Sequence, residues 1–264
     1  MKLYVLTENN PCSPEFEAEH GLSLYIQTDD GTGILFDTGQ TDLFIRNAEK
    51  LGIDLSDVDL AFLSHGHYDH GGGIPAFLAV NQKARVYLSD LAFTDCRHGE
   101  RYIGIDPALK GNDRIIPVSD RVSLGENITF VTCKHQPLLQ PVDSDGLTME
   151  TGHGEVPDRF DHEMYLILRE KGRKVVFSGC SHRGILNIQD WLRPDIFVGG
   201  FHLMHVPVTG PDTPELNRIA DRLLAYPTEY YTGHCTGTDQ YDCLKARMGD
   251  RLHPLHAGLV CQLI

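Results

Sequence analysis

The chain of 264 residues has few basic residues for its size. Lys and Arg total 23 against 37 Asp and Glu, so the formal net charge at neutral pH is -14. This shortage of positive charge argues against a broad electrostatic surface for nucleic acid or anionic lipid, and neither is expected as a partner. A small anionic substrate is compatible with this net charge, but binding it would need a positively charged group at the site itself.

Long apolar runs and paired cysteines are also lacking. No run approaches the ~20 apolar residues of a membrane helix, and the start, Met1 to Leu6, turns polar at Thr7 and does not resemble a signal peptide. The seven cysteines include no C-x-x-C pair. These absences predict a cytoplasmic chain with reduced thiols. The cysteines expected to be small buried side chains are Cys12, Cys96, Cys243 and Cys261.

Alternating apolar patterns predict an α/β protein of one domain spanning residues 1–264. Strands are predicted at Lys2–Leu6, Leu22–Gln27, Gly33–Phe36, Val58–Leu63, Arg85–Leu88, Ile115–Val118, Ile128–Thr132, Met164–Leu168, Val175–Phe177, Ile196–Val198, Tyr230–Thr232 and Gly258–Leu263. Helices are predicted at Thr41–Leu51, Ile74–Val80, Ile185–Trp191, Pro214–Ala225 and Tyr241–Met248. The pattern weakens over residues 94–161, which we interpret as an irregular insertion near the site, with a long loop at 136–158.

Histidine is the residue type in excess, with 14 in the chain, and it is the commonest metal ligand. Three of the 14 fall within residues 64–70, Ser-His-Gly-His-Tyr-Asp-His, directly behind the predicted strand Val58–Leu63. His65 and His67 can point the same way by the two-residue alternation and bind one ion, while Asp69 and His70 face a neighbouring position. The sequence therefore predicts a metal site here rather than a histidine-rich surface loop.

This H-x-H-x-D-H motif behind an apolar strand resembles the metallo-β-lactamase superfamily. The segment Leu35-Phe36-Asp37-Thr38-Gly39 is similar to the strand-end D-T-G of that superfamily. The segments at 178–182 (SGCSH), 199–203 (GGFHL) and 233–237 (GHCTG) together resemble one branch, the dihydropteroate-synthase-like or methanopterin-biosynthesis proteins. The resemblance spans nearly the whole chain and implies an αββα four-layer sandwich, in which two mixed sheets pack face to face with helices outside.

The resemblance also implies a set of metal ligands. The predicted ligands are His65, His67, Asp69, His70, His182 and His234. The first two would hold one metal, and the next two, completed by His234, would hold a second. His182 stands near the position where many members have an aspartate, and Cys180, whose thiolate also binds zinc, is the alternative there. The predicted cofactors are two divalent ions, zinc first, with manganese or iron as alternatives.

Other residues are candidates for supporting or catalytic roles. Asp69 and His202 are the predicted catalytic residues, with a structural role as the alternative for His202. The resemblance implies that Asp37 supports the metal ligands. Arg183 is a candidate for binding an anion, with a solvated helix residue as the alternative, and His153 reaches the metals only if the middle loop folds over them. Histidines expected to be ordinary surface or partly buried residues are His20, His98, His135, His162, His205, His253 and His256.

These patterns predict a di-metal enzyme that acts on an anionic, phosphorylated or pterin-like small molecule, by hydrolysis or by group transfer. The alternative is a metal-bound sensor or binding protein without turnover. Hydrolysis of β-lactams is disfavoured, because the late ligand pattern departs from that of the lactamases. The natural substrate and the oligomeric state stay open, and a homo-oligomer is compatible with the sequence.

Overall fold

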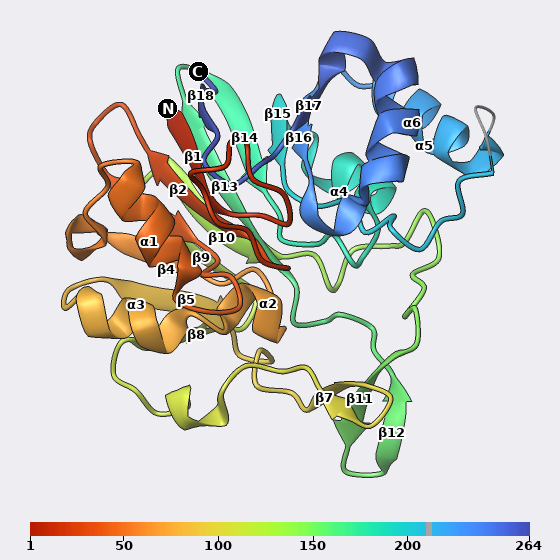
Figure 1. Cartoon of the computed structure of the whole chain (residues 1–264). Coiled ribbons are helices and arrows are strands. Elements are labelled where there is room, and N and C mark those ends of the chain that lie inside the picture. Colours follow the sequence, from red (N-terminus) through yellow and green to blue (C-terminus); the bar gives the residue numbers. More distant parts are fainter. Residues whose placement is uncertain (210–212) are drawn as a thin grey trace.

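The computed structural model describes residues 1–209 and 213–264. Two seven-stranded sheets pack face to face, and a smaller four-stranded sheet lies at one end of the molecule (Figure 1). The first sheet has the order β18 (Val260–Gln262), β1 (Lys2–Thr7), β2 (Ser23–Gln27), β3 (Gly33–Phe36), β4 (Leu60–Phe62), β5 (Arg85–Ser89) and β8 (Ile115–Val118). The second has the order β17 (Leu252–Pro254), β16 (Glu229–Thr232), β15 (Ile196–Val198), β14 (Arg173–Phe177), β13 (Met164–Glu170), β10 (Ile128–Thr132) and β9 (Arg121–Leu124).

Both large sheets mix parallel and antiparallel pairs. In the first, β1 and β2 are antiparallel while β3 and β4 are parallel. In the second, β13 and β14 are antiparallel while β14 and β15 are parallel. Parallel neighbours need a crossover connection, and helices supply it on the outer faces.

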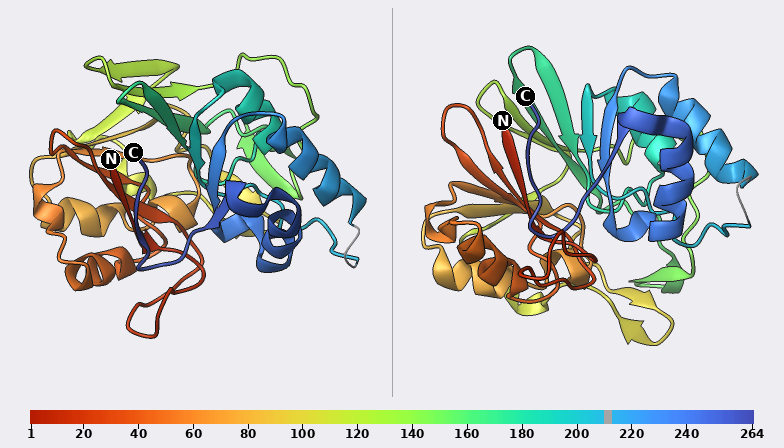
Figure 2. Two further views of the ribbon diagram at one scale, coloured as in Figure 1. Left: turned by 90° about the horizontal axis from the view of Figure 1, so that it is seen from above. Right: turned by 45° about the horizontal axis from the view of Figure 1, so that its top comes forward.

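Helices cover the outer face of each large sheet. Figure 2 shows α1 (Leu43–Lys50) and α3 (Ile74–Val80) on the outer side of the first sheet. The outer side of the second carries α4 (Ile185–Leu192), α5 (Pro214–Leu224) and α6 (Thr238–Met248). Single turns are α2 (Tyr68–Gly71), η1 (Leu55–Asp57), η2 (Pro107–Leu109), η3 (His234–Thr236) and η4 (Gly249–Arg251). The predicted fold class, a four-layer sandwich with helices outside two mixed sheets, is confirmed.

Three apolar layers hold these elements together, one between the sheets and one under each set of helices. Aromatic rings join the sheets across the middle, where the ring centroids of Phe36 and Phe177 lie 6.0 Å apart and those of Phe62 and Phe130 lie 5.1 Å apart. Strand β13 packs on both faces, with Leu166 toward the other sheet and its neighbours toward the helices. Such two-sided burial produces the continuous apolar runs that made these strands predictable.

The middle of the chain is more ordered than the sequence indicated. The stretch 136–158, predicted as a loop, contains β11 (Leu147–Thr151) and β12 (Gly154–Pro157), which form the four-stranded sheet with β6 (Cys96–His98) and β7 (Arg101–Tyr102). The loop prediction was wrong there because all four residues of β12 are exposed. An exposed strand carries no apolar alternation to reveal it. Within residues 94–161, β8, β9 and β10 also belong to the large sheets.

Two further sequence expectations can be compared with the structure. Cys96 is buried as expected, but Cys12 is exposed, and Cys243 and Cys261 are half-buried. Among the described residues, no helix combines the length and the apolar character needed to cross a bilayer.

Candidate metal centre

The predicted ligands lie where strands of both large sheets end. His65 follows β4, Cys180 and His182 follow β14, and His234 follows β16. Because the carboxyl ends of parallel strands meet at the same edge of a sheet, residues far apart in sequence converge there. The edge of the sandwich thus collects side chains from both sheets.

Glycine makes the close approach of these loops feasible. A Cβ on Gly179 would lie 2.1 Å from Ser64 Oγ, and one on Gly66 would lie 2.2 Å from the carbonyl oxygen of Ala92. Both distances are far below van der Waals contact. Any side chain at either position would push apart the segments that carry the ligands.

Three imidazoles form the first group of candidate ligands. The ring centroid of His65 lies 4.6 Å from that of His67 and 4.9 Å from that of His182. Within residues 1–209 and 213–264, Nε2 of His65, Nε2 of His67 and both ring nitrogens of His182 are buried without a hydrogen-bond partner. One ring nitrogen from each histidine lies within 4.8 Å of the others. Unpaired buried nitrogens are costly, and a shared cation would bind one nitrogen of each of the three rings.

The second group combines a carboxylate with two imidazoles. Asp69 Oδ2 lies 3.4 Å from His234 Nε2 and 3.7 Å from His70 Nε2, and the two Nε2 atoms are 3.2 Å apart. His20, which the sequence did not single out, places its Nε2 3.3 Å from the same oxygen of Asp69. Such short separations between an oxygen and several ring nitrogens are compatible with the ligands of a single ion.

Cys180 lies between the two groups. Its Sγ is 3.1 Å from His70 Nε2, and it lies within 4.8 Å of donor atoms of His65, His182 and His234. A thiolate at this place could contact an ion in either group.

Hydrogen bonds on the far side of the rings determine which nitrogen faces inward. His70 Nδ1 lies 2.7 Å from Asp37 Oδ2, so its N–H donates to that carboxylate and Nε2 is the nitrogen that faces inward. Ser64 Oγ donates to Asp37 Oδ2 and thus presents a lone pair to His65 Nδ1, 2.8 Å away. His234 Nδ1 lies 2.9 Å from Asn9 Oδ1. The arrangement prepares all three Nε2 atoms as metal ligands.

The electrostatics differ between the groups. Burial lowers the pKa of His65 and of His182 well below the usual value, and neighbouring imidazoles add to this effect. Burial also lowers the pKa of His67, to about 3. Burial disfavours the charged ring of His70 too, but the carboxylates of Asp69 and Asp37 outweigh it and raise its pKa to about 9. The first group therefore offers neutral nitrogens, and the second attracts positive charge.

His202 lies beside the first group. Its ring centroid is 4.1 Å from that of His182, and its Nε2 is 3.1 Å from Asp145 Oδ2. Burial opposes protonation of His202, but Asp145 and Cys235 outweigh it and raise the pKa to about 10. The His202–Asp145 pair lies next to the donor atoms and can hold a proton there.

A pocket of about 170 Å³ opens over both groups. Arg101 lines it, with its guanidinium 4.7 Å above the ring of Tyr68, and His98 and Leu147 of the small sheet line it too. Sequence reasoning missed Arg101, since no motif surrounds it. Strands β6 and β7 form a hairpin. The Tyr68 N–H donates to the carbonyl of Ile103, just after β7, at 2.9 Å, and this hydrogen bond holds the hairpin beside the site.

Two candidates lie elsewhere. Arg183 is buried and its guanidinium contacts Asp161 at 3.0 Å. It lines a separate cavity of about 1080 Å³. Its burial, and its position before α4 begins, contradict the alternative of a solvated helix residue. His153 is exposed in the turn between β11 and β12. It is not one of the described residues that line the pocket over the candidate ligands.

Comparisons with known proteins identify relatives of this chain. The sequence-family model of the metallo-beta-lactamase superfamily matches residues 17–231 of this chain. An uncharacterised protein of Methanocaldococcus jannaschii is 29% identical over 240 residues, which cover 87% of this chain and 88% of that protein. A second protein of the same organism, named 7,8-dihydropterin-6-methyl-4-(beta-D-ribofuranosyl)-aminobenzene-5'-phosphate synthase, is 26% identical, with 98% of this chain and 96% of the relative covered.

A solved structure matches over the full length. The crystal structure of Tm1679, described as a metal-dependent hydrolase of the beta-lactamase superfamily, superposes with a TM-score of 0.82 at 30% sequence identity. The match covers 100% of this chain and 99% of that one. The sequence-based resemblance to the superfamily and to its methanopterin-related branch is thereby confirmed.

Proposed function

Because the chain belongs to the metallo-beta-lactamase superfamily, we propose that it is a binuclear metal-dependent enzyme acting on a small anionic substrate by hydrolysis or the related group transfer. One observation carries the proposal. Two groups of buried donor atoms lie side by side, and hydrogen bonds to Nδ1 of His65, His70 and His234 already turn Nε2 of each toward the centre.

We assign the first ion to His65, His67 and His182, whose unpaired nitrogens fit a cation. The second is assigned to Asp69, His70 and His234, with Cys180 as a further ligand between the two. Zinc suits this mixture of imidazole, carboxylate and thiolate, and manganese or iron are the alternatives. Bound divalent ions supply Lewis acidity and lower the pKa of water toward neutrality.

The chain's own residues account for substrate binding and proton transfer. The pocket suits a phosphate-sized group better than a whole drug-sized ligand, because the pockets that bind such ligands have volumes of roughly 300–1,000 Å³. Arg101 provides the cation that a substrate anion needs. His202, paired with Asp145, is the candidate for giving a proton to a leaving group or taking one from an attacking group.

The named relatives support particular substrates. The product named for the 26% identical relative carries a dihydropterin and a phosphate, which supports a phosphorylated, pterin-like substrate. The 30% identical structure described as a hydrolase supports hydrolysis. Group transfer and hydrolysis share the binding of an anionic group beside the metals, so the geometry suits both.

Elemental analysis of the purified protein tests the metal assignment, with close to two divalent ions per chain expected. A chain that binds none when titrated with zinc, manganese and ferrous iron contradicts the proposal. A panel of phosphomonoesters, phosphodiesters, pterin pyrophosphates and lactones, assayed with each metal, then separates the enzyme from the sensor. Metal-loaded protein that turns over no member of the panel supports the sensor.

A further inference from the structure

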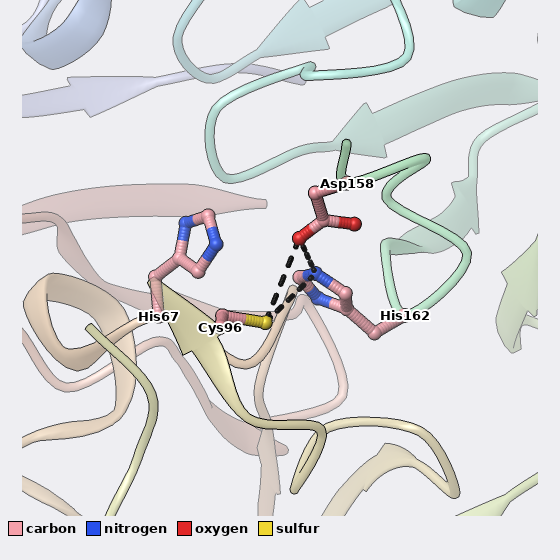
Figure 3. Close-up of side chains that lie close together, drawn as sticks. All are labelled: His67, Cys96, Asp158 and His162. Carbon is pink, nitrogen blue, oxygen red and sulfur yellow. Dashed lines mark hydrogen bonds and ion pairs between the residues drawn. The ribbon is translucent and has the colours of Figure 1, made fainter. Parts of the chain in front are cut away.

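A third group of buried polar side chains borders the first metal group. Cys96, Asp158 and His162 are 1%, 3% and 2% exposed. Figure 3 shows their contacts: Cys96 Sγ lies 3.5 Å from Asp158 Oδ2 and 3.8 Å from His162 Nε2, and His162 Nε2 lies 3.2 Å from Asp158 Oδ2. His67 stands beside them. Such a donor set and spacing could belong to zinc or to a hydrogen-bonded cluster.

A hydrogen bond to the other nitrogen of His162 decides between these alternatives. The N–H of Gly66 donates to His162 Nδ1 at 3.0 Å, so Nδ1 carries the lone pair. In the neutral ring the proton is then on Nε2, where it faces Asp158 Oδ2. A metal on Nε2 would require a proton on Nδ1, directly against the Gly66 N–H. The cluster is therefore hydrogen-bonded, and Nε2 holds a proton rather than a metal.

This hydrogen bond acts on the residue between two candidate ligands. Gly66 separates His65 from His67, and its backbone is confined on another side by the carbonyl of Ala92, which leaves no room for a Cβ. With Ala92 at one side and His162 at another, the peptide between the two histidines has little freedom. Restricting that peptide restricts the directions in which the side chains of His65 and His67 leave the backbone.

The short segment that contains Asp158 and His162 also contacts His182, the third candidate ligand of the first group. The ring of Phe160 stacks on that of His182, with centroids 4.3 Å apart and planes at 13°. Asp158 Oδ1 accepts from the Phe160 N–H at 2.7 Å, which supports Phe160 in its left-handed conformation at φ 55°. Glu163 Oε1 accepts from the backbone N–H of His182 at 2.8 Å.

We infer that residues 158–163, here named the clamp segment, position all three histidines of the first metal group, and that His162 is a positioning residue for metal binding. The inference rests on the proposed function, since it assumes that His65, His67 and His182 bind an ion. The clamp segment contacts Gly66 and His182 and contributes no ligand to the first metal group. The segment lies between the ligand motifs at 64–70 and 178–182 and belongs to neither, which explains why no motif revealed it.

Zinc titration of the full-length protein against a chromophoric chelator tests the inference. His162→Ala removes the acceptor for the Gly66 N–H, and we expect the first zinc to bind about 10–100-fold more weakly while the second is unchanged. His162→Asn places an oxygen near the position of Nδ1, and it should recover most of the affinity. His135→Ala is the matched control, because His135 is an exposed histidine whose ring contacts Asp120; it should bind as the wild type does.

If circular dichroism shows that His162→Ala does not fold, Phe160→Leu provides a second test. Leucine keeps the site apolar but removes the stacked ring from His182, and the first zinc should again bind more weakly. If His162→Ala folds and binds zinc with wild-type affinity, the inference is overturned while the proposed function stands. If His162→Ala does not fold, wild-type affinity in Phe160→Leu has the same consequence. Three zinc ions in the wild type and two in Cys96→Ala would overturn it in favour of a third metal site. A wild-type chain that binds no zinc would overturn the proposed function and the inference together.

Discussion

Single hydrogen bonds orient three imidazoles at this centre, those of His65, His70 and His234. Asp37 contacts both Ser64 and His70, and through Ser64 it also reaches His65. One buried carboxylate thereby sets the tautomer of a candidate ligand in each group. Partners of this kind hold metal ligands in place without touching the ion.

Asp37→Asn should therefore weaken metal binding although the residue is not a predicted ligand. Asp37 Oδ1 accepts from the Ser64 backbone N–H, and Oδ2 accepts from the Ser64 hydroxyl and from His70. An amide keeps only one of these two oxygens and presents an N–H₂ group at the place of the other. We expect metal affinity to fall by about 10–100-fold, measured by competition with a chelator. Asp59→Asn is the control, since that carboxylate is exposed and pairs with Lys83 at 3.0 Å. Equal affinities in both variants would contradict the role of Asp37.

Asp69 contributes differently, because it is a predicted ligand itself. Its carboxylate lies near His20, His70 and His234, and these three partners hold its pKa well below the usual value despite the opposing effect of burial. Asp69→Ala should reduce the metal content from about two ions to about one per chain and suppress turnover, with circular dichroism unchanged. Unaltered activity would remove Asp69 from the mechanism.

At the scale of elements, the small sheet supplies one wall of the pocket over the candidate ligands. Strand β7 supplies Arg101, and an isolated bridge joins His67 to Gly104, just beyond that strand. The hairpin is therefore anchored on the ligand motif itself. It places a positive charge in the pocket lined by the candidate ligands, in a protein that is acidic as a whole.

Arg101→Met should raise KM for an anionic substrate more than it lowers kcat. A hydrogen bond to a charged group contributes about 1.5–3 kcal/mol, and each 1.4 kcal/mol is about a tenfold change, so KM should rise at least about tenfold. Steady-state kinetics with the best substrate of the panel measures this. Arg97→Met is the matched control on β6, because Arg97 pairs with Asp95 at 2.8 Å. An equal rise in both variants would contradict a specific contact.

The sequence predicted elements well where burial leaves an apolar pattern and poorly where it does not. Strand β13 and helix α5 were found because their buried residues recur at strand and helix spacing. Strand β12 was missed because it is exposed. The burial of His162 was also missed, because its partner Cys96 lies in a strand of the small sheet, more than sixty residues away. Pairing of short strands over such separations leaves no local trace.

The same limit applies to the candidate site. Every predicted ligand follows a strand with a clear apolar run, so the convergence of all six could be argued from chain order and a family resemblance. The roles of Arg101, His20 and the clamp segment depend on loops that cross the edge of the sandwich. Their positions follow from tertiary contacts, which a single sequence does not encode locally.

The whole molecule should depend on its metals for part of its stability. The candidate ligands join the ends of strands from both large sheets, so an ion bound there links the two halves of the sandwich, and in the unfolded chain the site does not exist. Binding at each site stabilises the folded chain by about 2.7 kcal/mol when the free metal is 100 times Kd. For a chain of this size each kcal/mol shifts Tm by about 2–4 °C.

Removing the metals with a chelator should therefore lower Tm by about 10–20 °C if both ions are lost, and adding zinc should restore it. Differential scanning fluorimetry of metal-free and zinc-loaded protein measures the shift. His234→Ala, which removes a ligand of the second group alone, should retain about half of the shift, while His135→Ala should retain all of it, because His135 is exposed and remote from the ligands in sequence. A Tm that does not respond to zinc in the wild type would show that the two sheets hold together without any ion, and the proposed metal sites would then have no role in the stability of the fold.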